Sequence, residues 1–474
     1  MSKEARELVV IGGGPGGYPA AFYASDLGMK VTVIDKELNP GGVCLFKGCI
    51  PSKALLHVAK LLNESKEAAE WGVTFGETKV DLDKLRSYKE GVVKKLTGGL
   101  GMLSKQRNVD FIQGTAEFID SHNLKVTREN GKVEEMRFEK AIIATGSRPT
   151  KVPGLSIDSP RVVDSTGALE LPFLPKNMLV IGGGYIGLEM GSVYHSIGSE
   201  VSVVEMTSHL LPSADRDLVQ PLEKRLRKQF KDIKLKTKVA ALEDVGDTVK
   251  VTFEDEKGKK TEEHFEMVLI SIGRRPNSQG FGLENTGVKV NDRGWIETDN
   301  QRRTHESHIW AIGDVAGEPM LAHKATYEGK VAIQAIQGKR SIYDPAAIPA
   351  VVFTDPEIAW AGITELEAKD QGIAVKVSKF PWSASGRATT LDRSDGLTKL
   401  ITHPETEQIL GIGICGPGAG ELIAEGTLAI EMGATVEDLS LTIHPHPTLS
   451  ETMMESAEVY YGHSPHFFQP KKKK

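Results

Sequence analysis

One glycine-rich pattern occurs twice in this chain of 474 residues, and it constrains the fold more than any other feature. LVVIGGGPGGY begins at Leu8, and MLVIGGGYIGL begins at Met178. The spaced glycines are Gly12, Gly14 and Gly17 in the first copy and, each 170 residues later, Gly182, Gly184 and Gly187 in the second. In each copy the next apolar run ends in an acid, Asp35 or Glu205. A strand, glycine turn, helix and second strand form a nucleotide-binding unit, so the pattern predicts two Rossmann-like modules in an α/β fold.

The glycines and the acid of each copy suit a dinucleotide. The first glycine permits a tight turn, the second lets the backbone approach a pyrophosphate, and the third lets the helix pack on the strand. Asp35 and Glu205 can each accept hydrogen bonds from an adenosine ribose. The residues after Glu205, Met206 to Ser208, include no arginine for a 2′-phosphate, so we expect NAD rather than NADP there. Turns without a ligand are the alternative, but two copies with matched acids disfavour it.

Two such sites on one chain indicate electron transfer between two cofactors, and FAD with NAD is the economical pair. Thr304 to Asp314, THESHIWAIGD, supports FAD, because an acid at the end of an apolar strand can bind a flavin side-chain hydroxyl. The alternative for its Gly-Asp pair is an ordinary turn. AIIATGSRP, from Ala141 to Pro149, is echoed by VLISIGRRP, from Val268 to Pro276. Between the acid and this echo the first copy is about 43 residues longer, and the extra length contains two cysteines.

Beyond residue 346 the pattern changes. VVFTDPEIAWAG, AVKVSKFPW and LTKLITH predict antiparallel strands, and Glu421 to Met432 predicts an amphipathic helix. We therefore expect an α+β domain after the two modules.

Composition excludes several classes of protein. The 58 basic and 64 acidic residues leave a net charge of −6, which disfavours a nucleic-acid surface. No run approaches the roughly 18 apolar residues of a membrane-spanning helix, and the first residues lack the apolar core of a signal peptide. Three cysteines do not form a secreted disulfide framework. We expect a soluble cytoplasmic protein without membrane attachment, and a solvated tail in the terminal lysine run 471–474.

The stretch GGVCLFKGCIPSK, residues 41–53, contains Cys44 and Cys49. Zinc sites need four ligands, and the third cysteine, Cys415, has no histidine pair beside it, so we expect no metal. A structural staple is disfavoured in a reducing compartment. Lys47 and Lys53 flank the pair near the start of a predicted helix, and such surroundings lower a thiol pKa. A reactive pair is favoured, with an inert buried pair as the alternative and a core position expected for Cys415.

The spacing of the pair also predicts a local distortion. Residues i and i+5 of a straight helix have Cα atoms about 8–9 Å apart, whereas a disulfide needs less than about 7 Å. We expect the break at Gly48, and a strained short loop makes a disulfide more reducible.

A candidate base lies near the C-terminus, in IHPHPTLSE, from Ile443 to Glu451. Prolines on both sides of His446 restrict its backbone, and Glu451 can hydrogen-bond one ring nitrogen and make the other more basic. Thiol chemistry needs such a base. The alternative is a surface turn with two histidines, in which His444 is structural.

The motifs IGGGPGGY, GGVCLFKGCIPSK, ATGSRP, IGGGYIGLEM, WAIGD and HPHPTLSE together resemble the pyridine nucleotide–disulfide oxidoreductases along essentially the full length, especially members that oxidise dihydrolipoamide with NAD⁺. The resemblance implies an FAD domain interrupted by an NAD domain, followed by a dimerisation domain. The implied boundaries are 1–150 and 278–346 for FAD, 151–277 for NAD and 347–474 for the interface.

The resemblance also implies roles for individual residues. Cys44 exchanges disulfides with the substrate, Cys49 faces the flavin, and His446 with Glu451 comes from the other subunit of a homodimer. Further FAD contacts are Lys53, Thr145, Gly146, Asp314 and Ala322 beside His323; NAD contacts are Glu189, which also pairs with Lys53, and Gly273. The implied partner is a lipoyl-bearing protein of a 2-oxo acid dehydrogenase or glycine cleavage complex.

One departure from the family lies between the cysteines, where Phe46-Lys47 replaces the usual Asn-Val. It leaves substrate preference as the open question. The alternatives are another FAD- and NAD(P)H-dependent disulfide reductase of the family and a scaffold component of a multienzyme complex.

Overall fold

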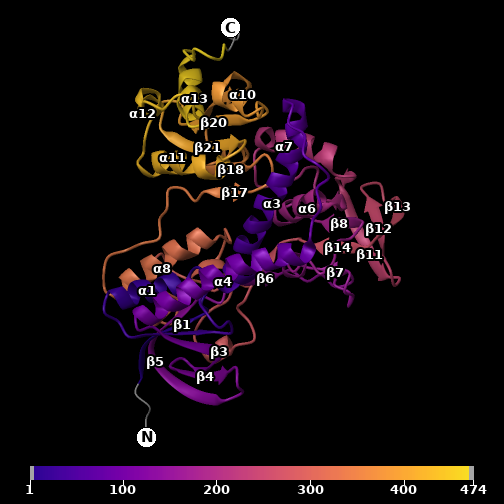
Figure 1. Cartoon of the computed structure of the whole chain (residues 1–474). Coiled ribbons are helices and arrows are strands. Elements are labelled where there is room, and N and C mark those ends of the chain that lie inside the picture. The colour runs from indigo at the N-terminus through magenta and orange to yellow at the C-terminus, as the bar shows by residue number, and fades with distance from the viewer. Residues whose placement is uncertain (1–4, 469–474) are drawn as a thin grey trace.

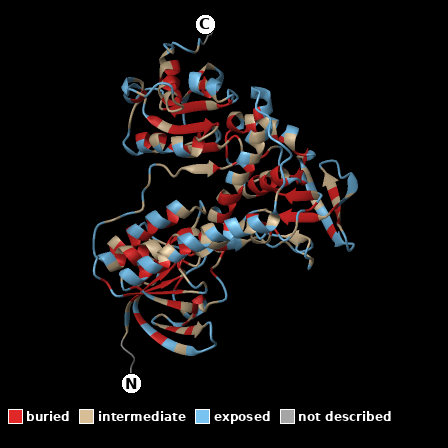
Figure 2. Ribbon diagram, in the orientation of Figure 1, coloured by how far each residue is buried: buried red, intermediate tan, exposed pale blue. Residues whose placement is uncertain are grey.

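The computed structural model describes residues 5–468, so the lysine run 471–474 lies outside the described residues. Figure 1 shows the first sheet near the N-terminal end, the C-terminal sheet at the opposite end and the second module beside them. Buried residues concentrate in the strands and in the inner faces of the helices (Figure 2). Within residues 5–468, no helix combines the length and apolarity needed to cross a membrane.

The first sheet is mostly parallel, and its central strand carries the first glycine pattern. Strand β1 pairs with β2 on one side and β5 on the other, while β16 pairs with β5 after a return from the second module. The apolar runs form strands because helices α1 and α8 cover one face, where Leu8 and Val10 are fully buried. The elements are β1 (Arg6–Ile11), α1 (Gly17–Asp26), β2 (Val31–Asp35), β3 (Asp110–Asp120), β4 (Asn123–Arg128), β5 (Val133–Ile143), β16 (Ile309–Ala311), η2 (Leu283–Asn285), η3 (Gly313–Ala316) and α8 (Ala322–Ile336).

The second module repeats this plan in a five-stranded parallel sheet of order β10-β9-β8-β14-β7, with an antiparallel sheet β11-β12-β13 beside it. Its elements are β7 (Val162–Val163), α5 (Ser165–Leu169), β8 (Asn177–Ile181), α6 (Tyr185–Ile197), β9 (Glu200–Val204), α7 (Arg216–Gln229), β10 (Asp232–Lys234), β11 (Thr237–Asp244), β12 (Val249–Asp255), β13 (Lys260–Phe265) and β14 (Met267–Ile270). The two sequence echoes pair with each other, because β6 (Ser147–Pro149) is antiparallel to β15 (Arg274–Pro276). The echoes therefore join the modules.

The extra length of the first copy is helical. It forms α2 (Gly42–Lys47), α3 (Cys49–Glu67), η1 (Ala68–Trp71) and α4 (Leu82–Gln106). Leu55 of α3 and Met190 of α6 share one buried apolar cluster, so this segment packs on the second module. The expected distortion is confirmed: Gly48 separates α2 from α3 with φ −148° and ψ −112°.

The C-terminal domain has a five-stranded antiparallel sheet of order β17-β18-β21-β20-β19. The predicted strands and helix are confirmed, but β21, a central strand, is absent from the sequence prediction because it contains Gly411 and Gly413, which disfavour strands. A Cβ on Gly411 would lie 2.0 Å from the Ile363 carbonyl oxygen, so close backbone approach explains this glycine. The elements are β17 (Ala350–Val352), β18 (Ile358–Gly362), α9 (Glu365–Gln371), β19 (Lys376–Pro381), η4 (Trp382–Ala384), α10 (Gly386–Thr390), β20 (Leu397–Thr402), β21 (Ile409–Cys415), α11 (Ala419–Glu431), α12 (Val436–Leu441) and α13 (Glu451–Tyr461).

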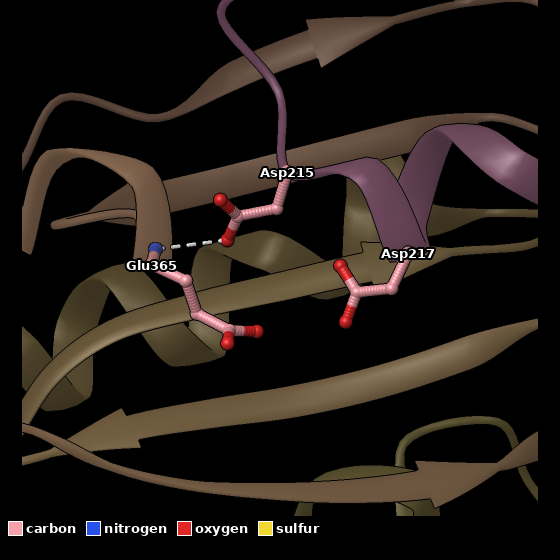
Figure 3. A group of neighbouring side chains, drawn as sticks. All are labelled: Asp215, Asp217 and Glu365. Carbon is pink, nitrogen blue, oxygen red and sulfur yellow. Dashed lines mark hydrogen bonds between the residues drawn. The ribbon is translucent and has the colours of Figure 1, made fainter. Parts of the chain in front are cut away.

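A cluster of charged side chains connects the second module to the C-terminal domain. Figure 3 shows Asp215, Asp217 and Glu365 converging, with the Glu365 N–H donating to Asp215 at 3.0 Å. The ammonium of Lys399, whose side chain is 1% exposed, contacts all three carboxylates at 2.5–2.8 Å. A buried ammonium must be paired, so these acids serve as its counter-ions. Because β16 returns to pair with β5, we propose that residues 1–150 and 278–346 form one domain, with 151–277 and 347–474 as the other two.

Candidate active site

The first glycine turn tolerates only glycine at two positions. Gly12 has φ +105°, and a Cβ there would lie 2.3 Å from the Ala144 carbonyl oxygen. A Cβ on Gly17 would lie 1.8 Å from the Gly12 oxygen, so α1 must pack closely on the turn. Asp35 closes the turn by accepting the N–H of Gly13 at 2.6 Å and of Glu37 at 2.8 Å. Burial raises the pKa of Asp35, and these two N–H donors oppose the shift.

The second turn has the same geometry. Gly182 has φ +108°, and a Cβ there would lie 2.5 Å from the Ser271 carbonyl oxygen. Glu205 accepts the N–H of Gly183 at 2.7 Å and of Thr207 at 2.7 Å. Nothing lies within 4 Å of the Cβ position of Gly184, so this turn is open at its second glycine.

A single cavity gathers most of the predicted FAD residues together with both cysteines. It lies where the strands of the first sheet end, the usual ligand position in such sheets. Its lining includes Gly12, Gly14, Asp35, Lys53, Thr145, Gly146, Asp314, Ala322, Cys44 and Cys49. Gly17 packs beneath the turn, and Gly182, Gly184, Gly187, Glu205 and Gly273 are not among the lining residues.

The cavity fits FAD. Its lining runs from Asp35, past the glycine turn, to Cys49, which places a ribose acceptor and a pyrophosphate cradle in one continuous space with the thiols. Gly42 lets the cysteine segment pack closely on this turn, because a Cβ there would lie 2.5 Å from Gly14 Cα. A dinucleotide with a redox ring at its far end therefore suits these residues.

The two cysteines are free thiols whose side chains hydrogen-bond each other across the break at Gly48. The hydrogen bond from Cys44, assisted by the charge of Lys53 and opposed by burial, lowers the pKa of Cys49 to about 7. The same hydrogen bond, with burial, raises the pKa of Cys44. The pair is thus unequal, because Cys49 ionises more readily than Cys44.

Lys53 and Glu189 meet at this cavity. Lys53 Nζ lies 2.8 Å from Glu189 Oε2, which is the pairing that the family resemblance implies. Glu189 was expected among the NAD contacts, but its carboxylate lines the thiol cavity, on the first turns of α6 rather than at the second glycine turn.

The prediction missed five residues beside the cofactor cavity. Ser147 donates to Asp314 and accepts from Arg274 Nε at 2.7 Å, which ties both echoes to the Gly-Asp motif. Ser147 and Arg274 lie in the two similar stretches AIIATGSRP and VLISIGRRP, so the sequence repeat was the signal that could have paired them. The others are Tyr185, Asn277 and, against Lys53, Phe353.

The candidate base lies in the C-terminal domain. His446 Nδ1 is 2.8 Å from Glu451 Oε1, and Thr448 N–H donates to the other carboxylate oxygen at 2.7 Å. Burial works to raise the pKa of Glu451, but these two partners outweigh it and lower the pKa. The His446 side chain is 74% exposed and does not line the thiol cavity of its own chain.

The other two predicted histidines have structural contacts. His444 is 5% exposed and lies 2.7 Å from Glu425, as a structural residue would. His323 does not line the cavity; its Nε2 lies 2.8 Å from the Pro349 carbonyl oxygen, so only Ala322 of that pair faces the cavity. Cys415 is fully buried, and burial raises its pKa, in agreement with the expected core position.

Comparison with known proteins gives full-length matches. The chain is 48% identical over 463 residues to the dihydrolipoyl dehydrogenase of Vibrio parahaemolyticus, covering 98% of this chain and 97% of that one. A Staphylococcus aureus dihydrolipoyl dehydrogenase is 44% identical over 460 residues, covering 97% of each.

Two solved structures also match nearly the full length of the chain. LpdA from Mycobacterium tuberculosis matches with a TM-score of 0.88 and 28% identity over 96% of this chain and 99% of that one. The HOCl-induced flavoprotein disulfide reductase RclA from Escherichia coli matches with a TM-score of 0.84 and 30% identity over 96% and 99%.

Family models cover both parts of the chain. Residues 6–329 match the pyridine nucleotide-disulphide oxidoreductase model, and residues 348–457 match the dimerisation domain of the same family. FAD and NAD are the cofactors of this family. Fold, cavity, cysteine pair and matches agree, and the chain belongs to the pyridine nucleotide-disulphide oxidoreductases.

Proposed function

We propose that this protein is a dihydrolipoyl dehydrogenase, which oxidises dihydrolipoamide to lipoamide with NAD⁺ as the acceptor. The carrying observation is the unequal dithiol, with a Cys49 pKa of about 7, in the same cavity as the first glycine turn. Relatives at 44–48% identity with that name support the substrate.

The chemistry of the two thiols follows from their difference. A substrate thiolate attacks the Cys44 sulfur of the oxidised pair, and Cys49 leaves as a thiolate, because a thiol of low pKa is the better leaving group. The second substrate thiolate then displaces Cys44, closing the lipoamide ring and leaving the protein as a dithiol. When bound, FAD supplies the electron acceptor for this dithiol and the hydride donor for NAD⁺.

His446 accepts the substrate proton at Nε2. Its Nδ1 faces Glu451, which fixes the tautomer and stabilises the imidazolium. Because His446 is exposed and outside its own thiol cavity, we propose that it serves the cavity of a second copy, so the enzyme is a homodimer. Exposed apolar side chains in the same domain support such an interface: Leu428, Met432, Leu441 and Ile443.

Further assignments belong to the same proposal. NAD binds at the second turn, where Gly182, Gly184, Gly187 and Glu205 supply the backbone cradle and the ribose acceptor. The protein-bound substrate is a lipoyl group on a partner of a 2-oxo acid dehydrogenase or glycine cleavage complex. The low cysteine content supports a cytoplasmic location.

Replacing Cys44 tests the function. We expect Cys44→Ser to lose at least about 1000-fold in dihydrolipoamide-dependent NADH formation, because disulfide exchange needs both sulfurs. FAD content and NADH oxidation by an artificial electron acceptor should persist. Cys415→Ser, a buried thiol outside the cavity, is the matched control and should retain turnover. Full lipoamide turnover in Cys44→Ser would remove the dithiol mechanism.

Mixed dimers test the shared site. Cys44→Ser and His446→Gln homodimers should each be nearly inactive, the second by about 100- to 10,000-fold. Refolding or co-expressing the two together should restore activity, because one of the two sites then combines intact Cys44 with intact His446. His444→Gln is the control for substitution in this loop. If mixing restores nothing, each site is built from a single chain.

A further inference from the structure

An aromatic ring from the C-terminal domain lies against the lysine of the thiol cavity. Lys53 Nζ is 4.4 Å from the centroid of the Phe353 ring, within the range of a cation–π contact. Phe353 N–H donates to Glu189 Oε1 at 3.0 Å, while Lys53 contacts Glu189 Oε2 at 2.8 Å. The three residues close a ring of contacts.

Each member of this ring comes from a different element. Lys53 lies on α3, one helical turn after Cys49, so both side chains share one face of that helix. Glu189 lies on α6 and its side chain is only 4% exposed. Phe353 directly follows β17. A lysine ammonium on its flexible stem needs partners on more than one side to be held in one place, and the carboxylate and the ring provide two.

We propose that Phe353 is a positioning residue of the active site: its ring holds the Lys53 ammonium against Glu189 at the thiol cavity, where the lysine charge favours the thiolate form of Cys49. The inference rests on the proposed function, because it explains how the dithiol is prepared for exchange. Phe353 itself does not line the cavity and acts through Lys53.

Cys44, Glu189 and Tyr185 also surround Cys49, but none of them is a cation. Lys53 is the cation that the Phe353 ring contacts. Cys44 on α2 and Glu189 on α6 both act on Cys49, the first by a hydrogen bond and the second by repulsion. Tyr185 on α6 is neutral, because burial, with the charge of Glu189, raises its pKa to about 12.

Two more charged groups line the same cavity from β15 and η3. Arg274 donates to the hydroxyl and carbonyl oxygens of Ser147, and Asp314 accepts from the same hydroxyl. Since both are held by Ser147, a change at Phe353 leaves them in place.

The test measures the titration of Cys49 in the FAD-loaded protein. In a Cys44→Ser background, Cys49 is the remaining thiol of the pair, and its thiolate beside an oxidised flavin gives a long-wavelength absorbance that can be followed against pH. Phe353→Leu and Phe353→Met remove the ring in two shapes, while Phe353→Tyr keeps it. FAD content and thermal unfolding are measured for each protein.

We expect both ring-less variants to raise the titration midpoint by about 0.5 pH unit, which is roughly threefold less thiolate below the midpoint. Phe353→Tyr should restore the parent midpoint. Alkylation of Cys49 by iodoacetamide, located by mass spectrometry, should slow by the same factor.

The outcomes separate the inference from the function. An unchanged midpoint in the ring-less variants, or an equal shift in Phe353→Tyr, overturns the role of the ring alone. Absence of the absorbance at every pH in the parent Cys44→Ser protein contradicts the proposed dithiol site instead. If one ring-less variant fails to fold, the other carries the comparison.

Discussion

The two nucleotide modules share the geometry of their turns. Gly12 and Gly182 have φ values of +105° and +108°. The N–H of the following glycine donates to the acid of its module, from Gly13 to Asp35 and from Gly183 to Glu205. Each acid also accepts an N–H two residues further on, from Glu37 or Thr207. The duplicated sequence pattern therefore produces the same local hydrogen bonds twice.

Their surroundings differ. In the first module Gly42 lies against Gly14, and a Cβ on Gly16 would touch Ala325 at 3.3 Å. In the second, a Cβ on Gly184 would meet nothing within 4 Å. The first turn is enclosed by the cysteine segment and α8, whereas the second is open at Gly184. The same motif thus suits a retained cofactor in one module and an exchanged nucleotide in the other.

The largest expected effect separates the two turns directly. Gly12→Ala should yield protein with at least about tenfold less bound FAD, because the methyl group meets Ala144 and the backbone is left-handed. Gly182→Ala should keep its FAD and raise the KM for NAD⁺ by about tenfold. Flavin absorbance per protein and steady-state kinetics measure both.

A glycine far from both turns controls for backbone strain. Gly131 has φ +78° with nothing within 4 Å of its Cβ position, so Gly131→Ala has the strain without the collision. It should change neither FAD content nor the KM for NAD⁺. Equal FAD loss in Gly12→Ala and Gly182→Ala would break the distinction between the modules.

Local features of both modules were predictable from the sequence. Strands β1 and β8, the acids Asp35 and Glu205, and the break at Gly48 follow from periodicity, spacing and helix geometry. Contacts between distant segments were not. Lys53 and Glu189 lie 136 residues apart, and only the family resemblance paired them. Phe353 has no local signal, because its position beside Lys53 depends on how a third domain packs.

Glu205, at the second glycine turn, is expected to determine which nucleotide binds there. Glu205→Gln should raise the KM for NAD⁺ by about fivefold, because the amide oxygen still accepts a hydrogen bond but a charged acceptor is worth about 1 kcal/mol more than a neutral one. FAD content should remain that of the parent. In the parent, kcat/KM for NAD⁺ should greatly exceed that for NADP⁺, because Glu205 repels a 2′-phosphate. Equal use of both nucleotides would contradict the role of this acid.

The smallest expected effect concerns the segment that encloses the first turn. Lys47 Nζ lies 2.8 Å from Glu37 Oε1, which joins α2 to the end of β2 at the cofactor cavity. Lys47 is 40% exposed, and exposed ion pairs contribute no more than about 1 kcal/mol, so Lys47→Val should speed FAD release by at most about fivefold. The difference should shrink at high salt, because mobile ions screen the pair. Lys36→Val is the control, since Lys36 lines the same cavity beside Glu37. Identical FAD release from Lys47→Val and the parent at low salt would mean that the cysteine segment encloses the cofactor by shape rather than by charge.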